Sequence, residues 1–178
     1  MGTTLTAIHV DGRRAHIGHV GDSRAYLVRA GKLHRLTKDQ SFTQAMVDLG
    51  FLKESERELS PYPGRILQAL GQPPSQPLVV ATSTLDLRDG DAFVVCSDGL
   101  TNAVEDAEIE QFVRSGGPFD ETCQALVDLA NLRGGEDNIT ILIAGISGRL
   151  PPPTPTESVE ATHRVVSCYQ PLLPPDGY

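Results

Sequence analysis

The segment that most constrains the fold is the uncharged run Ala92-Phe93-Val94-Val95-Cys96, which leads directly into Ser97-Asp98-Gly99. The run is short, and its centre is aromatic and β-branched, so it predicts a strand buried on both faces rather than a helix. Because glycine permits a sharp turn directly after Asp98, the carboxylate is presented at the strand end. Such an aspartate can also simply close the strand as an Asx-turn. Other carboxylates converging on the same place would favour a functional site instead.

The composition indicates one globular domain, with 178 residues of which 39% are hydrophobic and 21% charged. The formal net charge of −8 disfavours nucleic acid or an anionic membrane surface as the main partner, because both bind basic faces, and it suits a protein that holds cations. The three cysteines are too widely spaced for a zinc site or a disulfide framework. No apolar run is long enough to span a membrane and no signal peptide is recognisable, so a cytoplasmic location is expected.

The order of the predicted elements indicates an α+β chain built mainly from antiparallel strands. Turn signals such as Asp11-Gly12 separate the first strands without a helical crossover. Strands are predicted over residues 3–10, 13–20, 25–29, 33–36, 78–85, 92–97 and 139–146, and helices over 42–49, 105–114 and 119–132.

Two stretches lack a clear periodicity of apolar residues. Residues 53–77 are charged and contain prolines, and they predict a surface insertion with one short helical piece around 65–70. Insertions of this kind serve as lids or binding flaps, or are simply tolerated as loops, and both interpretations stay open. Beyond residue 147 the composition changes, since seven of the 13 prolines lie in the last 29 residues. Residues 148–178 are therefore predicted to form a Pro-rich disordered tail or linker.

Three segments place an aspartate at a predicted strand boundary, next to small or amide residues. They are Gly21-Asp22-Ser23, Ser97-Asp98-Gly99 and Glu136-Asp137-Asn138. Carboxylates gathered from separate strand ends are typical ligands of hard divalent cations such as Mg²⁺ or Mn²⁺. Two such ions about 3.5–4 Å apart can activate a bridging water as a nucleophile. Because aspartate is also common in turns, the spacing alone leaves both interpretations open.

The motifs of the chain, taken together and in order, resemble those of the metal-dependent protein phosphatases (PPM, protein phosphatase 2C type), in particular bacterial members. The resemblance covers residues 1 to about 147 and rests on Met1-Gly2-Thr3-Thr4, Val20-Gly21-Asp22-Ser23-Arg24-Ala25-Tyr26, Leu36-Thr37-Lys38-Asp39, Ala69-Leu70-Gly71, Cys96-Ser97-Asp98-Gly99-Leu100 and Asp137-Asn138-Ile139-Thr140. Each motif alone is weak, whereas the ordered set is specific. The intact motifs argue against the more diverged stage II sporulation phosphatases.

The resemblance implies a sandwich of two antiparallel β-sheets flanked by helices (α-β-β-α) over residues 1–147, with a flap at about 42–70. It implies hydrolysis of phosphoserine and phosphothreonine by a water that Mn²⁺ or Mg²⁺ activates, without a catalytic side chain. The partners would be phosphorylated proteins, the substrates of a Ser/Thr kinase. Carried over by position, Asp98 and Asp137 would hold one ion of a binuclear pair, and Asp22 with Asp98 would bind a third ion. Arg24 would be a structural partner of the strand ends.

The chain also departs from the family pattern. The family has two further motifs upstream of Met1, one with the phosphate-binding arginine and one with the aspartate that bridges the two ions. Neither is present, so the sequence is expected to be truncated at its N-terminus; a mis-assigned start, a fragment boundary and a genuine truncation stay open. Gln40 and Gln68 replace the usual His and Arg of the flap region.

Without the bridging aspartate, the chain alone is expected to bind a metal weakly and to be inactive or weakly active, because cation affinity follows the number of charged ligands. A non-catalytic, pseudophosphatase-like module for metal binding or interaction is the alternative. Loss of the upstream segment is also expected to leave a sheet edge and part of the core open.

Overall fold

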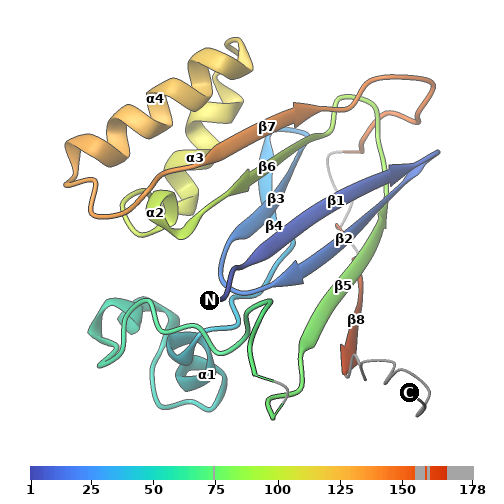
Figure 1. The fold of residues 1–178 in the computed structure, drawn as a ribbon. Coiled ribbons are helices and arrows are strands. Elements are labelled where there is room, and N and C mark those ends of the chain that lie inside the picture. Colours follow the sequence, from blue (N-terminus) through green and yellow to red (C-terminus); the bar gives the residue numbers. More distant parts are fainter. Residues whose placement is uncertain (74, 155–158, 160, 168–178) are drawn as a thin grey trace, which may run out of the picture.

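The structure, a computed structural model, describes all residues except 74, 155–158, 160 and 168–178 (Figure 1). The strands of the described part form two antiparallel four-stranded sheets. One sheet has the order β1 (Leu5–Asp11), β2 (Arg14–Val20), β5 (Val79–Asp86) and β8 (Thr162–Ser167). The other has the order β4 (Lys32–Arg35), β3 (Arg24–Arg29), β6 (Ala92–Cys96) and β7 (Ile141–Gly145).

The helices lie in two places. Figure 1 shows α2 (Asp98–Thr101), α3 (Asp106–Arg114) and α4 (Phe119–Leu132) together on the outer side of the β4–β3–β6–β7 sheet. Helix α1 (Phe42–Asp48) and the 3₁₀ helix η1 (Glu54–Leu59) lie apart from them and contact each other. The predicted α+β class, with two antiparallel sheets and flanking helices, is confirmed. The predicted strands and the three predicted helices are all present and differ only at their ends.

Strands β3 and β6 are buried on both faces because their side chains alternate between two cores. Leu27 and Phe93 pack between the two sheets, whereas Tyr26 and Val94 pack against the helices. A strand with both faces covered carries apolar residues at every position. The interpretation of residues 92–96 as a strand buried on both faces is therefore confirmed.

A buried ion pair joins β3 to the turn before β6. The Arg29 guanidinium donates from Nε to Asp91 Oδ1 at 2.9 Å and from an Nη to Oδ2 at 2.6 Å. The Asp91 side chain is fully buried and the Arg29 side chain is 5% exposed. Such paired charges are stable when every polar atom has a partner, but loss of one member leaves the other buried alone.

The segment around residues 65–70 is not helical, so that prediction is wrong. The backbones of Thr3 and Leu70 exchange two hydrogen bonds, N–H to O at 3.0 and 2.8 Å, and a further bridge joins Ser41 to Ile66. The segment is held extended by partners distant in sequence, which no local pattern indicates. The helical turn of this insertion is η1 instead.

The Pro-rich region after residue 147 contains a strand where none was expected. Strand β8 pairs antiparallel with β5, with Ala81 opposite Val165. The stretch between Pro155 and Pro171 is free of proline and contains the β-branched pair Val165-Val166, so it can extend an open sheet edge. Residues 155–158, 160 and 168–178 of the expected tail lie outside the described residues.

Among the described residues, no helix has both the length and the apolar composition that crossing a bilayer requires.

We expect Asp91→Asn to lower the free energy of unfolding by about 3 kcal/mol, because it removes the buried carboxylate charge that the Arg29 guanidinium contacts at 2.6 Å. Urea denaturation followed by circular dichroism measures this change. Asp86→Asn is the matched control, since the Arg14–Asp86 pair has side chains 66% and 63% exposed, and it should change stability by less than about 1 kcal/mol. Equal effects of the two substitutions would show that burial of the Arg29–Asp91 pair is unimportant.

Candidate metal centre

The three predicted metal ligands lie at the same end of the β4–β3–β6–β7 sheet. In the strand register, Cys96 at the end of β6 is opposite Arg24 at the start of β3 and Ile141 at the start of β7. Asp22 precedes β3, Asp98 follows β6, and Asp137 precedes β7. Antiparallel pairing thus brings together two strand starts and one strand end that are far apart in the sequence.

Ser97 joins the ends of β6 and β7. Its hydroxyl donates to the carbonyl of Asn138 at 3.1 Å and accepts from the N–H of Thr140 at 3.0 Å. The residue after Asp98 must be glycine, because a Cβ on Gly99 would lie 2.5 Å from the Asn138 carbonyl oxygen. The loop that carries Asp137 is therefore held directly against the start of α2, which carries Asp98.

Asp22 and Asp98 repel each other electrostatically, and the charge of Arg24 offsets this repulsion only in part. Partial burial, then the negative charge of Asp98 and that of Asp39, raises the pKa of the Asp22 carboxyl from 3.8 to about 6. Among the described residues, no ion pair involves Asp22 or Asp98. Like charges held in one place are destabilising unless a cation joins them, and such groups are candidate functional sites. The pair therefore fits a divalent cation.

Asp137 is the most exposed of the three predicted ligands. Its side chain is exposed, and Oδ1 accepts a hydrogen bond from the N–H of Asn138 at 2.7 Å. Within the described residues, no group of three or more His, Cys, Asp or Glu side chains is gathered closely enough to hold a metal ion. In the structure, Asp22 and Asp98 thus interact electrostatically, whereas Asp137 lies exposed at the edge of the candidate site. A site of this kind fits a weakly held, largely hydrated ion.

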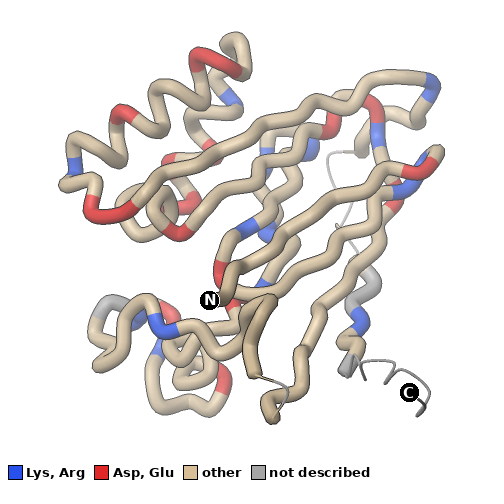
Figure 2. Tube along the Cα trace, viewed as in Figure 1, with Lys and Arg blue, Asp and Glu red and all other residues tan. Residues whose placement is uncertain are grey.

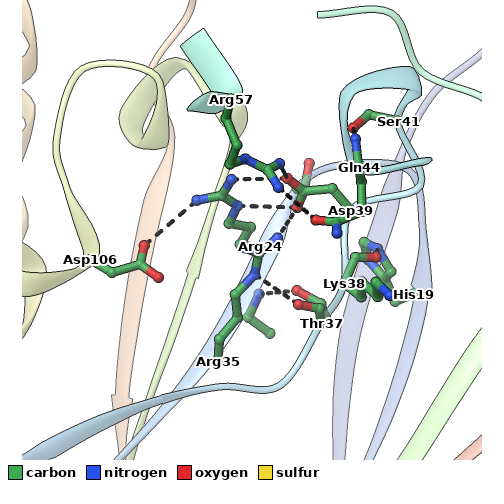
Figure 3. A network of polar contacts seen from close by, with 12 residues as sticks. His19, Arg24, Arg35, Thr37, Lys38, Asp39, Ser41, Gln44, Arg57 and Asp106 are labelled. Carbon is green, nitrogen blue, oxygen red and sulfur yellow. Dashed lines mark hydrogen bonds and ion pairs between the residues drawn. The ribbon is translucent and has the colours of Figure 1, made fainter. Parts of the chain in front are cut away.

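A buried aspartate beside this centre was not foreseen from the sequence. Asp39 accepts hydrogen bonds from three arginines, Arg24 at 2.9 and 3.1 Å, Arg57 at 2.9 Å, and Arg35 (Figure 3). Burial alone would raise the pKa of Asp39, but the hydrogen bonds and charge of Arg24, together with the other two arginines, hold it below its usual value. Asp39 belongs to one of the recognised motifs, and Arg35 is only four residues away, but no local signal shows that Arg24 and Arg57 also meet there.

The network around Asp39 links the flap region to the Asp22 turn. Arg24 follows Asp22 by two residues, and its guanidinium is directed to Asp39 and Asp106 rather than to Asp22 (Figure 3). Arg57 comes from η1 in the insertion. Arg24 is thus a structural partner, as the resemblance implied.

The two glutamines that depart from the family pattern are structural as well. Gln40 Oε1 accepts from the N–H of Gly21 at 2.8 Å, and Gln40 Nε2 donates to the carbonyl of Val79 at 3.1 Å. Gln68 Oε1 accepts from the N–H of Val79 at 2.9 Å. Both therefore connect the flap region to the start of β5, and Gln40 also fixes the turn before Asp22.

Comparison with known proteins agrees with this architecture. The family model "Protein phosphatase 2C" matches residues 1–133. The chain belongs to the protein phosphatase 2C family. The serine/threonine protein phosphatase PstP of Mycobacterium tuberculosis is 38% identical over 146 residues, which are 82% of this chain and 28% of PstP. The protein phosphatase PhpP of Streptococcus pneumoniae is 36% identical over 147 residues, 83% of this chain and 59% of PhpP.

Solved structures of the family share the fold. The M. tuberculosis PstP structure has a TM-score of 0.76 at 36% identity and covers 83% of this chain, which spans 61% of that one. The Streptococcus agalactiae serine/threonine phosphatase has a TM-score of 0.74 at 40% identity over 80% of this chain and 59% of that one. A structure of the PstP catalytic domain contains two manganese ions. This chain therefore spans less than two thirds of each of these relatives.

We expect Asp22→Asn to stabilise the metal-free protein at pH 7.5 by on the order of 1 kcal/mol, since it removes repulsion that solvent already screens in part. The folded state binds the Asp22 proton more tightly than the unfolded state. The unsubstituted protein should therefore gain stability as the pH falls through about 6 towards 4, and the variant should lack this gain.

Urea titrations at several pH values measure both effects. Asp137→Asn, at the exposed rim, serves as the control and should leave the pH dependence intact. If Asp22→Asn destabilises the protein at every pH, Asp22 acts as a structural turn residue and the assignment to a cation site is wrong.

Proposed function

We propose that this chain provides part of a metal-dependent Ser/Thr protein phosphatase whose substrates are phosphoserine and phosphothreonine in proteins. The observation that carries the proposal is the pair Asp22 and Asp98, two carboxylates that repel each other at the ends of strands buried on both faces and that form no ion pair among the described residues. The names of the relatives, which are serine/threonine phosphatases, support the substrate class. The two manganese ions bound to PstP support Mn²⁺ or Mg²⁺ as the cofactor.

Asp22 and Asp98 would hold the ion, and Asp137 would reach it from the rim. When bound, the ion supplies Lewis-acid activation of the water that attacks phosphorus. It is also needed to admit the substrate, because a phosphate group is repelled by the two carboxylates and by a chain of net charge −8. Ser97 and Gly99 hold the Asp137 loop in place, and the bond from Arg24 to Asp39 holds the turn that carries Asp22.

Two observations support low activity of the chain by itself. Fewer than three ligand groups are gathered among the described residues, so an ion would be bound weakly. In addition, the guanidinium of Arg24, which lies next to the centre, is directed to Asp39 and Asp106 and is therefore not placed to clamp a phosphate. The same observations favour the second candidate, a non-catalytic module that binds metal or phosphoprotein partners. In either case we propose a cytoplasmic location and partners that a Ser/Thr kinase phosphorylates.

Isothermal titration of the purified chain with Mn²⁺ tests the centre. We expect a dissociation constant in the range of about 10⁻⁴ to 10⁻³ M, typical of sites with few charged ligands, and loss of the signal in Asp98→Asn. Asp128→Asn on the exposed side of α4 is the matched control and should bind like the unsubstituted chain. Micromolar or tighter binding would contradict the incomplete site, and equal binding by Asp98→Asn would place the ion elsewhere.

Turnover of a phosphothreonine peptide in millimolar Mn²⁺ separates the two candidates. We expect little or none from the chain alone. Turnover that disappears in Asp98→Asn but persists in Asp128→Asn would exclude the non-catalytic module and show that the chain is an enzyme without further segments.

A further inference from the structure

A cavity of about 620 Å³ lies between the flap region and the β1–β2–β5–β8 sheet. Residues of the flap region and of the strands β2, β5 and β8 line it. Its apolar lining includes Ile17, Ala45, Leu67, Val79, Ala81 and Val165. Cavities of about 300–1,000 Å³ are typical binding sites. This flap cavity is therefore large enough to hold a bound segment.

One wall of the flap cavity comes from a part of the chain that the family model does not include. Arg164 and Val165 of β8 line the cavity. The family model matches residues 1–133, so β8 lies outside it. The cavity is therefore completed by residues particular to this chain.

The mouth of the flap cavity exposes apolar side chains. Val165 is 66% exposed and Leu67 is 44% exposed, and both line the cavity. Figure 2 shows little charge along β5 at this edge, since the strand carries none before Asp86 at its last position. Exposed apolar surface around a cavity marks an interaction site.

The charges that line the flap cavity leave one cation without a partner. Arg35 pairs with Asp39, and Lys38 pairs with Asp48. Arg164 is exposed and forms no ion pair among the described residues. An occupant that is mainly apolar and carries one negative charge would therefore match the lining.

The chain leaves β8 at the mouth of this cavity. Ser167, the last residue of β8, is opposite Val79 in the strand register, and Val79 lines the cavity. Figure 1 shows this end of β8 beside the start of β5. Residues 168–178 follow directly and lie outside the described residues. They are thus attached to one wall of the cavity.

The composition of residues 168–178 matches the lining. Their sequence is Cys-Tyr-Gln-Pro-Leu-Leu-Pro-Pro-Asp-Gly-Tyr, in which Asp176 is the one charged side chain. Prolines on both sides of Leu172 and Leu173 favour an extended polyproline conformation, which loses little entropy when it docks. Such a chain advances about 3.1 Å per residue, so Leu172 comes within about 16 Å of the end of β8.

We propose that residues 168–178 of this chain dock in the flap cavity. Leu172 and Leu173 insert between α1 and the β5–β8 side of the sheet, and Asp176 lies near Arg164. The short tether makes docking intramolecular, so the segment is present at a millimolar effective concentration and competes well against free partners. The docked segment joins α1 to β5 and β8 and so fixes the flap region against the sheet. Docking depends on neither metal binding nor phosphatase activity.

Leu172→Trp tests the docking in the full chain, which contains no tryptophan of its own. We expect acrylamide to quench its fluorescence at least about threefold less than in the urea-unfolded chain, because a docked side chain keeps only a minor part of its surface exposed. Leu132→Trp, at an 85% exposed leucine at the end of α4, is the reference and should be quenched readily in the folded protein. Equal quenching of the two tryptophans overturns the proposal.

Leu67→Lys, added to Leu172→Trp, should restore strong quenching because it places a charge at the apolar mouth. Leu49→Lys is the matched control, since Leu49 is a 71% exposed leucine of the flap region that does not line the cavity, and it should leave the protection intact. Protection that survives Leu67→Lys, or that both substitutions remove equally, contradicts docking in this cavity. Protection that grows with protein concentration, together with a dimer, assigns the cavity to a second copy of the segment and also contradicts the proposal.

A second measurement does without tryptophan. The double substitution Leu172→Asp with Leu173→Asp should speed amide hydrogen exchange in α1 and at the start of β5, because the flap region loses a contact that holds it to the sheet. Exchange in α4, on the other sheet, should stay the same and serves as the internal control. Unchanged exchange in α1 would show that the segment does not hold the flap region.

Discussion

The burial of β3 and β6 on both faces is the constraint on which the rest of the structure depends. A strand covered by a second sheet on one side and by helices on the other cannot carry charge along its length. The polar residues of these segments are therefore confined to the strand ends. Antiparallel pairing of β3, β6 and β7 then brings the ends that carry Asp22, Asp98 and Asp137 to one edge. The position of the candidate centre follows from how the core is covered.

The concentration of negative charge at this edge is balanced by the arginine network on Asp39. Three guanidinium groups surround one buried carboxylate close to the Asp22 turn, and two of them also pair with further carboxylates, Arg24 with Asp106 and Arg57 with Glu54. The arginines do not neutralise Asp22 and Asp98 directly, and the repulsion between these two carboxylates persists. Stability is thus supplied by the residues around the centre, while the centre itself keeps the unpaired charge that a cation needs.

The sequence predicts a feature when the interactions that create it join residues close together in the chain. The strand at residues 92–96 and the helix Phe119–Leu132 were predictable because their apolar periods are local. Strand β8, the extended segment at 65–70 and the contacts of Arg24 and Arg57 with Asp39 depend on partners more distant in the chain, so no local pattern indicates them. For the candidate site, motif order predicted Asp22, Asp98 and Asp137 together, whereas the exposed position of Asp137 is a tertiary feature.

The burial of the candidate ligands follows the strands that carry them. Asp22 and Asp98 adjoin β3 and β6, the two inner strands of their sheet, and both are half-buried. Asp137 precedes the edge strand β7 and is exposed. Its loop is joined to the inner strands through Ser97, which bonds the backbone of Asn138 and Thr140. The strand order of the sheet therefore decides how deeply each predicted ligand lies.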